Sequence, residues 1–167
     1  VGIRGAFTAS FLAEIERRTG QSVASHFDLL AGTSTGGIIA AALALGEPAE
    51  KIELMYRTRG VAIFTRQKPA KISLVRRLAL WALRRKFHDL DGDGLFQPKY
   101  ISESLMAALL DVFGHRTLEQ MCHRLVMPSV DLVKGQTVVF KTPHFPGLVR
   151  DRDVRAVDAV LATTAAP

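Results

Sequence analysis

Apolar and polar positions along the first third of the chain predict three helices and one short strand. Within residues 7–18 the apolar positions fall at helical spacing, at Phe7, Phe11, Leu12 and Ile15. The apolar run at residues 27–31 has the length of a strand. A second and more apolar helix is expected over residues 35–45, and a third over residues 50–56.

The last third of the chain predicts two helices around a pair of strands. A helix is expected over residues 100–113, strands over 125–132 and 137–141, and a last helix over roughly residues 154–163. Strands that alternate with helices indicate an α/β fold with a mostly parallel sheet. Because the sequence contains no internal repeat and no long linker, residues 1–167 are interpreted as a single domain.

Glycine and proline mark the boundaries of these elements. Gly20, Gly46 and Gly114 are expected to end helices, and Pro48 to begin one. The Lys134-Gly135 pair predicts a turn between the two late strands.

The two ends of the sequence predict an incomplete domain. Residues 1–5 have the pattern of a glycine-rich loop that opens a helix, and in α/β folds such a loop normally follows a strand. We therefore expect a strand before Val1 and further elements after Pro167.

Composition adds a few limits to this picture. The chain has 167 residues, of which 48% are hydrophobic, so it is long enough to bury a core. Its one cysteine, Cys122, excludes an internal disulfide framework and is typical of a cytoplasmic protein. No apolar run reaches the length of about eighteen residues that crosses a bilayer, and residues 1–10 lack the pattern of a signal peptide. Any membrane contact is therefore expected to be peripheral.

Positive charge is concentrated in one segment. The formal net charge is +6, yet no acidic residue occurs between Glu53 and Asp89, where ten arginines and lysines lie. The remainder of the chain has more acidic than basic residues. The segment over residues 57–95 is therefore interpreted as a basic insertion or cap that faces an anionic partner.

The most distinctive chemistry lies in the stretch "GTSTGG" at residues 32–37. Where a strand turns abruptly into a helix, a side chain at Gly32 or Gly36 would collide, and the corner residue adopts strained backbone angles. This geometry exposes the hydroxyl of Ser34 and points the N–H of Thr35 to where an oxyanion would form. The pattern predicts a nucleophile elbow made of Ser34 with Gly32, Thr33, Gly36 and Gly37.

Two other interpretations of this pattern compete with a nucleophile elbow. G-x-S-x-G also occurs by chance in ordinary turns, and a phosphate-binding loop uses similar geometry. Such a loop would require a lysine before the serine or threonine, and residues 32–37 contain none. The loop "GIRG", formed by Gly2, Ile3, Arg4 and Gly5, is compatible with an oxyanion hole or with a dinucleotide-binding loop.

Together these two motifs resemble the patatin-like phospholipase family. That family has a loop of the form G-G-G-x-R-G and, further along, G-T-S-T-G-G. The resemblance continues through most of the chain, in "PKYISESL" (98–105), "FGHRTLEQM" (113–121), "VMPSVDL" (126–132), "VVFKTP" (138–143) and "VLATTAAP" (160–167). The basic stretch near residues 57–95 is the part that differs.

The resemblance implies a three-layer α/β/α fold and lipid acyl hydrolase activity on phospholipids or other glycerolipids, without a cofactor or metal. It implies a Ser-Asp dyad with Ser34 as nucleophile and no catalytic histidine. Gly2, Ile3, Arg4 and Gly5 map onto the family's oxyanion loop. The family's aspartate lies in a D-G-[GA] motif after the segment that resembles "TTAAP", so we expect it beyond Pro167. The 167 residues alone are then expected to be nearly inactive, since base catalysis contributes about 10²–10⁴-fold.

Other aspartates are not assigned this role. Asp91-Gly92 and Asp93-Gly94 precede the helix expected at 100–113 and are interpreted as a turn, or alternatively as part of a calcium loop. The four later aspartates that were considered are not followed by glycine: Asp131, Asp151, Asp153 and Asp158.

Residues 71–87 could form an amphipathic helix. Its apolar face would carry Ile72, Leu74, Val75, Leu78, Trp81 and Leu83, opposite Arg76, Arg77 and Arg84. Such a helix suits docking of the segment over residues 66–86 on anionic lipid headgroups, or alternatively covering of the core with a solvated basic face. Nucleic-acid binding is disfavoured, because only Trp81 and Phe87 interleave with the charges.

Histidines offer a further alternative, an α/β-hydrolase triad. None of them has metal-ligand spacing, and each is interpreted as a surface or capping residue: His26, His88, His115, His123 and His144. A triad would use His123 or His144. Cys122 is interpreted as a small core residue. Three functions therefore remain in competition: a serine lipid acyl hydrolase, a membrane-docking or scaffold protein with a vestigial serine site, and a hydrolase with a Ser-Asp-His triad.

Overall fold

The computed structural model describes residues 4–64 and 103–165. The first range contains four elements and a short 3-10 helix: α1 (Arg4–Thr19), η1 (Val23–His26), β1 (Leu30–Ala31), α2 (Thr35–Ala44) and α3 (Ala49–Phe64). The second range contains α5 (Glu103–Phe113), η2 (Leu118–Gln120), β2 (Leu125–Asp131), β3 (Gln136–Lys141) and α6 (Ala156–Thr164). The predicted basic helix and the Asp-Gly pairs at 91–94 lie outside the described residues.

The described strands form a mixed sheet in the order β1-β2-β3. β1 and β2 are parallel, with Leu30 opposite Leu125. β2 and β3 are antiparallel and form a hairpin, in which Val126 pairs with Lys141. The prediction of an α/β fold is confirmed.

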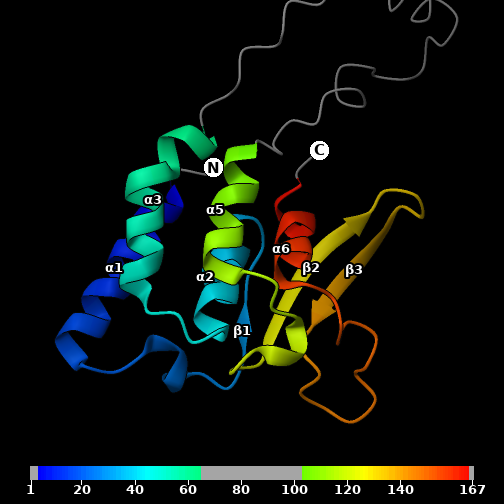
Figure 1. Ribbon diagram of the computed structural model, residues 1–167. Coiled ribbons are helices and arrows are strands. Elements are labelled where there is room, and N and C mark those ends of the chain that lie inside the picture. The colour runs from blue at the N-terminus through cyan, green and yellow to red at the C-terminus, as the bar shows by residue number, and fades with distance from the viewer. Residues whose placement is uncertain (1–3, 65–102, 166–167) are drawn as a thin grey trace, which may run out of the picture.

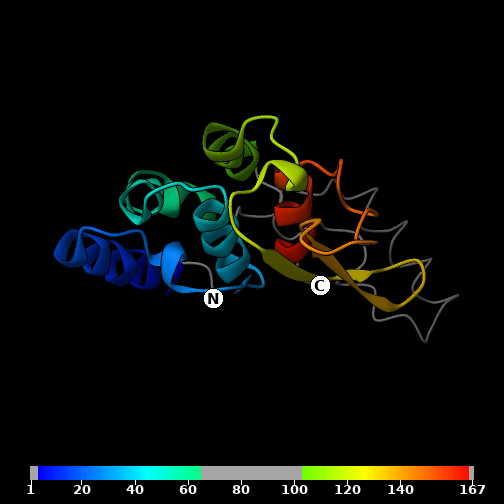
Figure 2. The same cartoon turned by 90° about the horizontal axis from the view of Figure 1, so that it is seen from below.

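Helices α2 and α6 lie side by side over one face of this sheet (Figures 1 and 2). In α2, residues 37–44 are buried, and nearly all of them are isoleucine, leucine or alanine. Alanine has little side chain to hold a sheet and a neighbouring helix apart, so this helix packs at close range against β1, β2 and α6. Because α2 is buried in the core, it fixes the position of the chain just before it. This turn around Ser34, called the serine corner, lies at the edge of the sheet.

The helix predicted from Phe7, Phe11, Leu12 and Ile15 is confirmed, but it does not bury its phenylalanines. Phe7 and Phe11 are 79% and 58% exposed, whereas Ala9 and Ala13 are buried. α1 packs mainly against α3, and the small-residue side of α1 allows the two helices to approach closely. Helix packing, and not side-chain size, thus determines which face of α1 is buried.

The boundaries of the elements follow the predicted glycines. Gly20, Gly46 and Gly114 directly follow or lie close to helix ends and have positive φ angles of 66°, 87° and 57°. Gly135 lies in the hairpin turn with φ of 61°.

The third helix, expected over residues 50–56, is observed over Ala49–Phe64. The first strand, expected over residues 27–31, is observed as Leu30–Ala31. It is shorter because the N–H of Phe27 bonds back to the carbonyl of Ala24 and closes η1 (3.3 Å).

None of the described helices is both long enough and apolar enough to span a membrane.

Candidate active site

Ser34 lies at the corner between the end of β1 and the start of α2. Its φ of 53° and ψ of −126° make it the one non-glycine residue with positive φ in the described part of the chain. Such angles are costly for a residue with a side chain, by about 1–3 kcal/mol, and persist only where the surroundings enforce them. The predicted corner with strained backbone angles is therefore observed.

Gly32 is required because the chain folds back on itself at this corner. A Cβ at Gly32 would lie 2.2 Å from the carbonyl oxygen of Gly36, which is backbone and has no room to move. Gly37 is also constrained, since a Cβ there would lie 2.6 Å from Cγ2 of Thr163. The expectation of a collision at Gly36 is wrong for the part of the chain that the structure describes: none of its atoms lies within 4 Å of a Cβ placed there.

The backbone around Ser34 is held by a set of hydrogen bonds. The N–H of Ser34 donates to the carbonyl of Thr163 at 3.1 Å, and the carbonyl of Ser34 accepts from Ile38 at 3.1 Å. Thr33 is exposed, and its carbonyl accepts from the N–H of Gly36 at 2.9 Å. The side chain of Ser34 is half-buried and does not cap α2. Its hydroxyl is therefore not engaged in holding the helix start.

The starts of α1 and α2 meet beside this corner (Figure 1). A Cβ at Gly5 would lie 3.1 Å from Cβ of Thr35 and 2.8 Å from the hydroxyl of Tyr56, so only glycine fits there. Arg4 and Gly5 belong to the first turn of α1 and not to a loop before it. Gly2 and Ile3 lie outside the described residues. Two helix N-termini, with their positive dipole ends, thus lie near Ser34, a suitable environment for a developing oxyanion.

Tyr56 of α3 joins this arrangement and was missed by the sequence analysis. Its hydroxyl donates to the carbonyl of Thr35 at 3.4 Å. Burial raises the pKa of Tyr56, so the hydroxyl keeps its proton and stays a hydrogen-bond donor at ordinary pH. A buried tyrosine needs a hydrogen-bond partner, but helical spacing does not reveal which one.

The two histidines considered for a triad lie away from Ser34. The N–H of His123 bonds to Ala44 at the C-terminal end of α2 (3.0 Å), and the ten residues of that helix separate it from Ser34 by roughly 15 Å. His144 contacts Thr142 through Nδ1 (2.9 Å), and the N–H of Thr142 bonds to Leu125 at the start of β2. Since β1 and β2 are parallel, Ser34 lies toward the opposite end of the sheet. The geometry does not favour a Ser-Asp-His triad.

Three of the aspartates considered have other partners. Asp131 accepts from the N–H groups of Val133 and Lys134 in the hairpin turn, at 2.9 and 3.2 Å. The carboxylate of Asp158 is bound by Arg155 in the first turn of α6. The structure does not bring these two carboxylates to Ser34.

Asp151 is the buried one of the three. Burial would raise its pKa, but bonds from Arg150 and from the N–H of Lys141 outweigh this, and the pKa is lowered. Asp151 is attached to β3, on the far side of β2 from Ser34. It therefore remains a charged structural group.

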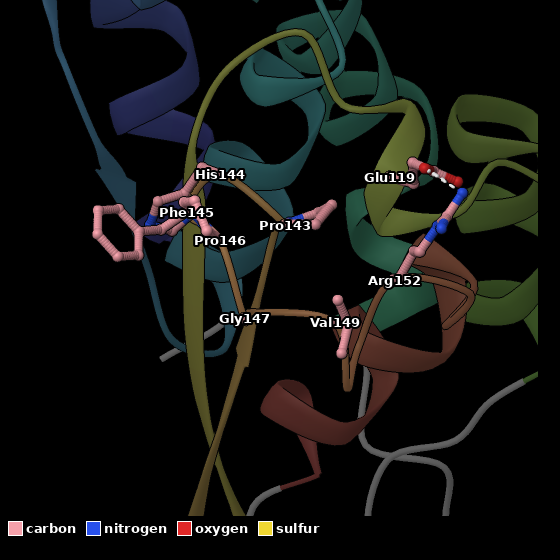
Figure 3. Close-up of a pocket in the computed structure, with 8 residues that line it drawn as sticks. All are labelled: Glu119, Pro143, His144, Phe145, Pro146, Gly147, Val149 and Arg152. Carbon is pink, nitrogen blue, oxygen red and sulfur yellow. Dashed lines mark ion pairs between the residues drawn. The ribbon is translucent and has the colours of Figure 1, made fainter.

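One further hollow lies at the end of the sheet where β2 begins and β3 ends, away from the serine corner. It has a volume of about 420 Å³ and is lined by Glu119, Pro143, His144, Phe145, Pro146, Gly147, Val149 and Arg152. Figure 3 shows Arg152 directed at Glu119, with which it forms an ion pair of 2.6 Å, and the ring of Phe145 turned away from the hollow. The guanidinium of Arg152 is thus already paired. Within the described ranges, no three histidine, cysteine or acidic side chains cluster as a metal site.

The sequence matches a known protein family and several of its members. The family described as patatin-like phospholipase matches residues 2–167. The chain is 38% identical over 166 residues to a cGAMP-activated phospholipase of Pseudomonas aeruginosa, covering 99% of this chain and 44% of that protein. It is 37% identical to a cGAMP-activated phospholipase of Vibrio cholerae, covering 99% of this chain and 46% of that protein.

A plant relative is more distant. Patatin-like protein 4 of Arabidopsis thaliana is 28% identical, over 99% of this chain and 40% of that protein. The chain therefore spans less than half the length of these relatives. With the family matched from residue 2 to residue 167, the chain belongs to the patatin-like phospholipase family.

Proposed function

We propose that the complete protein is a serine lipid acyl hydrolase that cleaves ester bonds of phospholipids or other glycerolipids, with Ser34 as nucleophile. The observation that carries the proposal is the strained Ser34 corner, with its half-exposed side chain, at the meeting point of two helix N-termini. Membership of a phospholipase family supports the substrate class.

In the proposed reaction, the hydroxyl oxygen of Ser34 attacks the ester carbonyl while an aspartate takes its proton. The N–H of Thr35, with the loop of Gly2, Ile3, Arg4 and Gly5, would hold the oxyanion. Collapse releases the alcohol and leaves an acyl-enzyme, which water then hydrolyses. We propose that the aspartate lies outside the 167 residues of this sequence, which would make the fragment alone nearly inactive.

A fluorophosphonate probe, which reacts with activated serines, tests this proposal on the complete protein. We expect the wild type to be labelled and Ser34→Ala to remain unlabelled. Ser25→Ala is a matched control, because Ser25 is exposed and its hydroxyl bonds only locally to Ser22 (2.6 Å). Equal labelling of wild type and Ser34→Ala would overturn the assignment.

A membrane-docking or scaffold protein with a vestigial serine site is the second candidate. The observation that favours it is the run of ten basic residues without an acidic one between Glu53 and Asp89. It predicts that the complete wild type sediments with anionic vesicles, that Ser34→Ala does so equally, and that neither hydrolyses esters. Ester turnover by the wild type that is lost in Ser34→Ala would exclude this candidate.

We further propose that a cyclic dinucleotide activates the complete protein. The support is that two of the relatives described above are named cGAMP-activated phospholipases, and that a third, from Escherichia coli, is named cUMP-AMP-activated. Phospholipid hydrolysis by the complete protein is measured with no nucleotide, with cGAMP and with cUMP-AMP. We expect one of the two to raise the rate at least tenfold. Equal rates in all three assays would contradict this proposal and leave the hydrolase assignment intact.

A further inference from the structure

The pairing between β1 and β2 ends in an unusual way at Ser34. The N–H of Leu30 donates to the carbonyl of Arg124, just before β2, at 2.9 Å, and the N–H of Gly32 donates to the carbonyl of Val126 in β2 at 3.3 Å. In a parallel ladder, alternate residues of one strand bond to alternate residues of the next. The next bond in this register would join the N–H of Ser34 to the carbonyl of Pro128.

The hydroxyl of Thr163 takes the place of that missing bond. Its Oγ1 donates to the carbonyl of Pro128 at 2.6 Å and accepts from the N–H of Ser34 at 3.4 Å. The carbonyl of the same residue accepts from the N–H of Ser34 at 3.1 Å. A hydroxyl has one proton, and because Pro128 takes it, the lone pairs remain for Ser34. One threonine thus bridges the end of β1 to β2 through a residue of α6.

The last turn of α6 is fixed at the same place. The final carbonyl groups of a helix have no partner within the helix and must find one elsewhere. The carbonyl of Thr163 is satisfied by the N–H of Ser34, and that of Ala162 by the hydroxyl of Ser129 at 2.8 Å. Thr163 is only 9% exposed, so water does not readily replace its hydroxyl. The end of α6 is therefore attached both to the corner and to the neighbouring strand.

We propose that Thr163 is a positioning residue for the Ser34 nucleophile. The positive φ of Ser34 needs surroundings that enforce it, and Thr163 supplies two of the contacts to its N–H. Loss of the hydroxyl would leave the Pro128 carbonyl without its donor and allow the corner to relax. Misplacement of a reacting group by about 1 Å can lower a rate by about 10²-fold. The inference rests on the proposed role of Ser34.

The test compares Thr163→Ser with Thr163→Ala in the complete protein. Both lack the methyl group, so they differ only in the hydroxyl. Fluorophosphonate labelling is followed to completion, and its end point gives the number of competent sites. The rate constant of labelling per competent site is measured separately. We expect Thr163→Ser to stay within about threefold of wild type and Thr163→Ala to fall roughly tenfold or more in rate constant and in kcat, with KM little changed.

Thr164→Ala is the matched control, because among the described residues the hydroxyl of Thr164 bonds to Leu161 within α6 (2.9 Å) and not to the corner. We expect it to behave like the wild type. A purely structural role of Thr163 would lower the count of competent sites or the melting temperature, but not the rate constant per site. Equal rate constants for the Ser and Ala variants would overturn the proposal for Thr163 alone. Failure of the wild type to be labelled would overturn it together with the proposed function.

Discussion

At the scale of single residues, the two glycines that frame Ser34 are not equivalent. A Cβ at Gly32 would lie 2.2 Å from the carbonyl oxygen of Gly36, whereas a Cβ at Gly36 would meet no atom of the described residues within 4 Å. The bend thus depends on Gly32 and not on Gly36, although both glycines are part of the G-x-S-x-G pattern.

A matched pair of alanine substitutions tests this difference. Gly32→Ala should lower the free energy of unfolding by about 3 kcal/mol or more, since backbone must move to admit the methyl group. Gly36→Ala should change it by no more than about 1 kcal/mol, because the site is open and alanine favours a helix. Chemical denaturation of both variants measures the difference. Equal destabilisation would show that the corner is not formed as described.

A second prediction concerns the contact between α2 and α6. Gly37→Ala places a methyl group 2.6 Å from Cγ2 of Thr163, whose χ1 is fixed by its bond to Pro128. We expect a loss of about 1–3 kcal/mol, most of which Thr163→Ser recovers by removing that methyl group. A double-mutant cycle by denaturation gives the coupling. Additive effects of the two substitutions would contradict a direct contact.

At the scale of elements, α1 and α3 are joined by a buried carboxylate. Glu53 of α3 accepts from the hydroxyl of Ser10 at 2.9 Å and forms ion pairs with Arg17 at 3.4 Å and Arg57 at 3.0 Å. The Ser10 hydrogen bond is the main cause that lowers the pKa of Glu53 below its ordinary value of 4.5, and it outweighs burial. Both arginines reach solvent, which screens their contribution.

This lowered pKa predicts the pH dependence of stability. The charged form of Glu53 stabilises the fold above pH 4.5, and the stabilisation is lost as pH falls through the lower, folded-state value. Glu53→Gln should therefore be less stable than wild type by about 1 kcal/mol at pH 7. The gap should close as pH falls below 4.5. Denaturation curves from pH 3 to pH 7 measure it, with exposed Glu50→Gln of the same helix as control. A gap independent of pH would contradict the assignment.

At the scale of the whole molecule, charge is distributed unevenly. The segment over residues 57–95 carries ten of the 22 lysines and arginines, with no acidic residue among them before Asp89. We propose that this segment docks the complete protein on anionic membranes. Basic residues near such a surface contribute about 1 kcal/mol each at physiological salt.

Vesicle sedimentation tests this docking. Replacing Arg76 and Arg77 with glutamine should weaken binding to anionic vesicles by about tenfold or more, and higher salt should weaken the wild type similarly. The control removes two exposed charges elsewhere, Arg18 and Lys134, and should bind like the wild type. If both pairs weaken binding equally, net charge and not this segment governs docking.

Local patterns in the sequence determined most of the elements and the serine corner. Helical spacing, turn glycines and the small residues around Ser34 are properties of neighbours in the chain, so the α/β class and the strained position of Ser34 could be predicted before any contact was known. The same local reasoning was wrong about a collision at Gly36, and helical spacing did not reveal that Phe7 is exposed.

Which distant groups meet at that corner depends on how the helices pack in three dimensions. Thr163 lies 129 residues after Ser34, and Tyr56 reaches Thr35 from another helix. Such pairings leave no trace in local periodicity, because each partner occupies an ordinary position on its own helix. Their geometry arises when α2, α3 and α6 pack together, and that packing depends on the shape of the whole core.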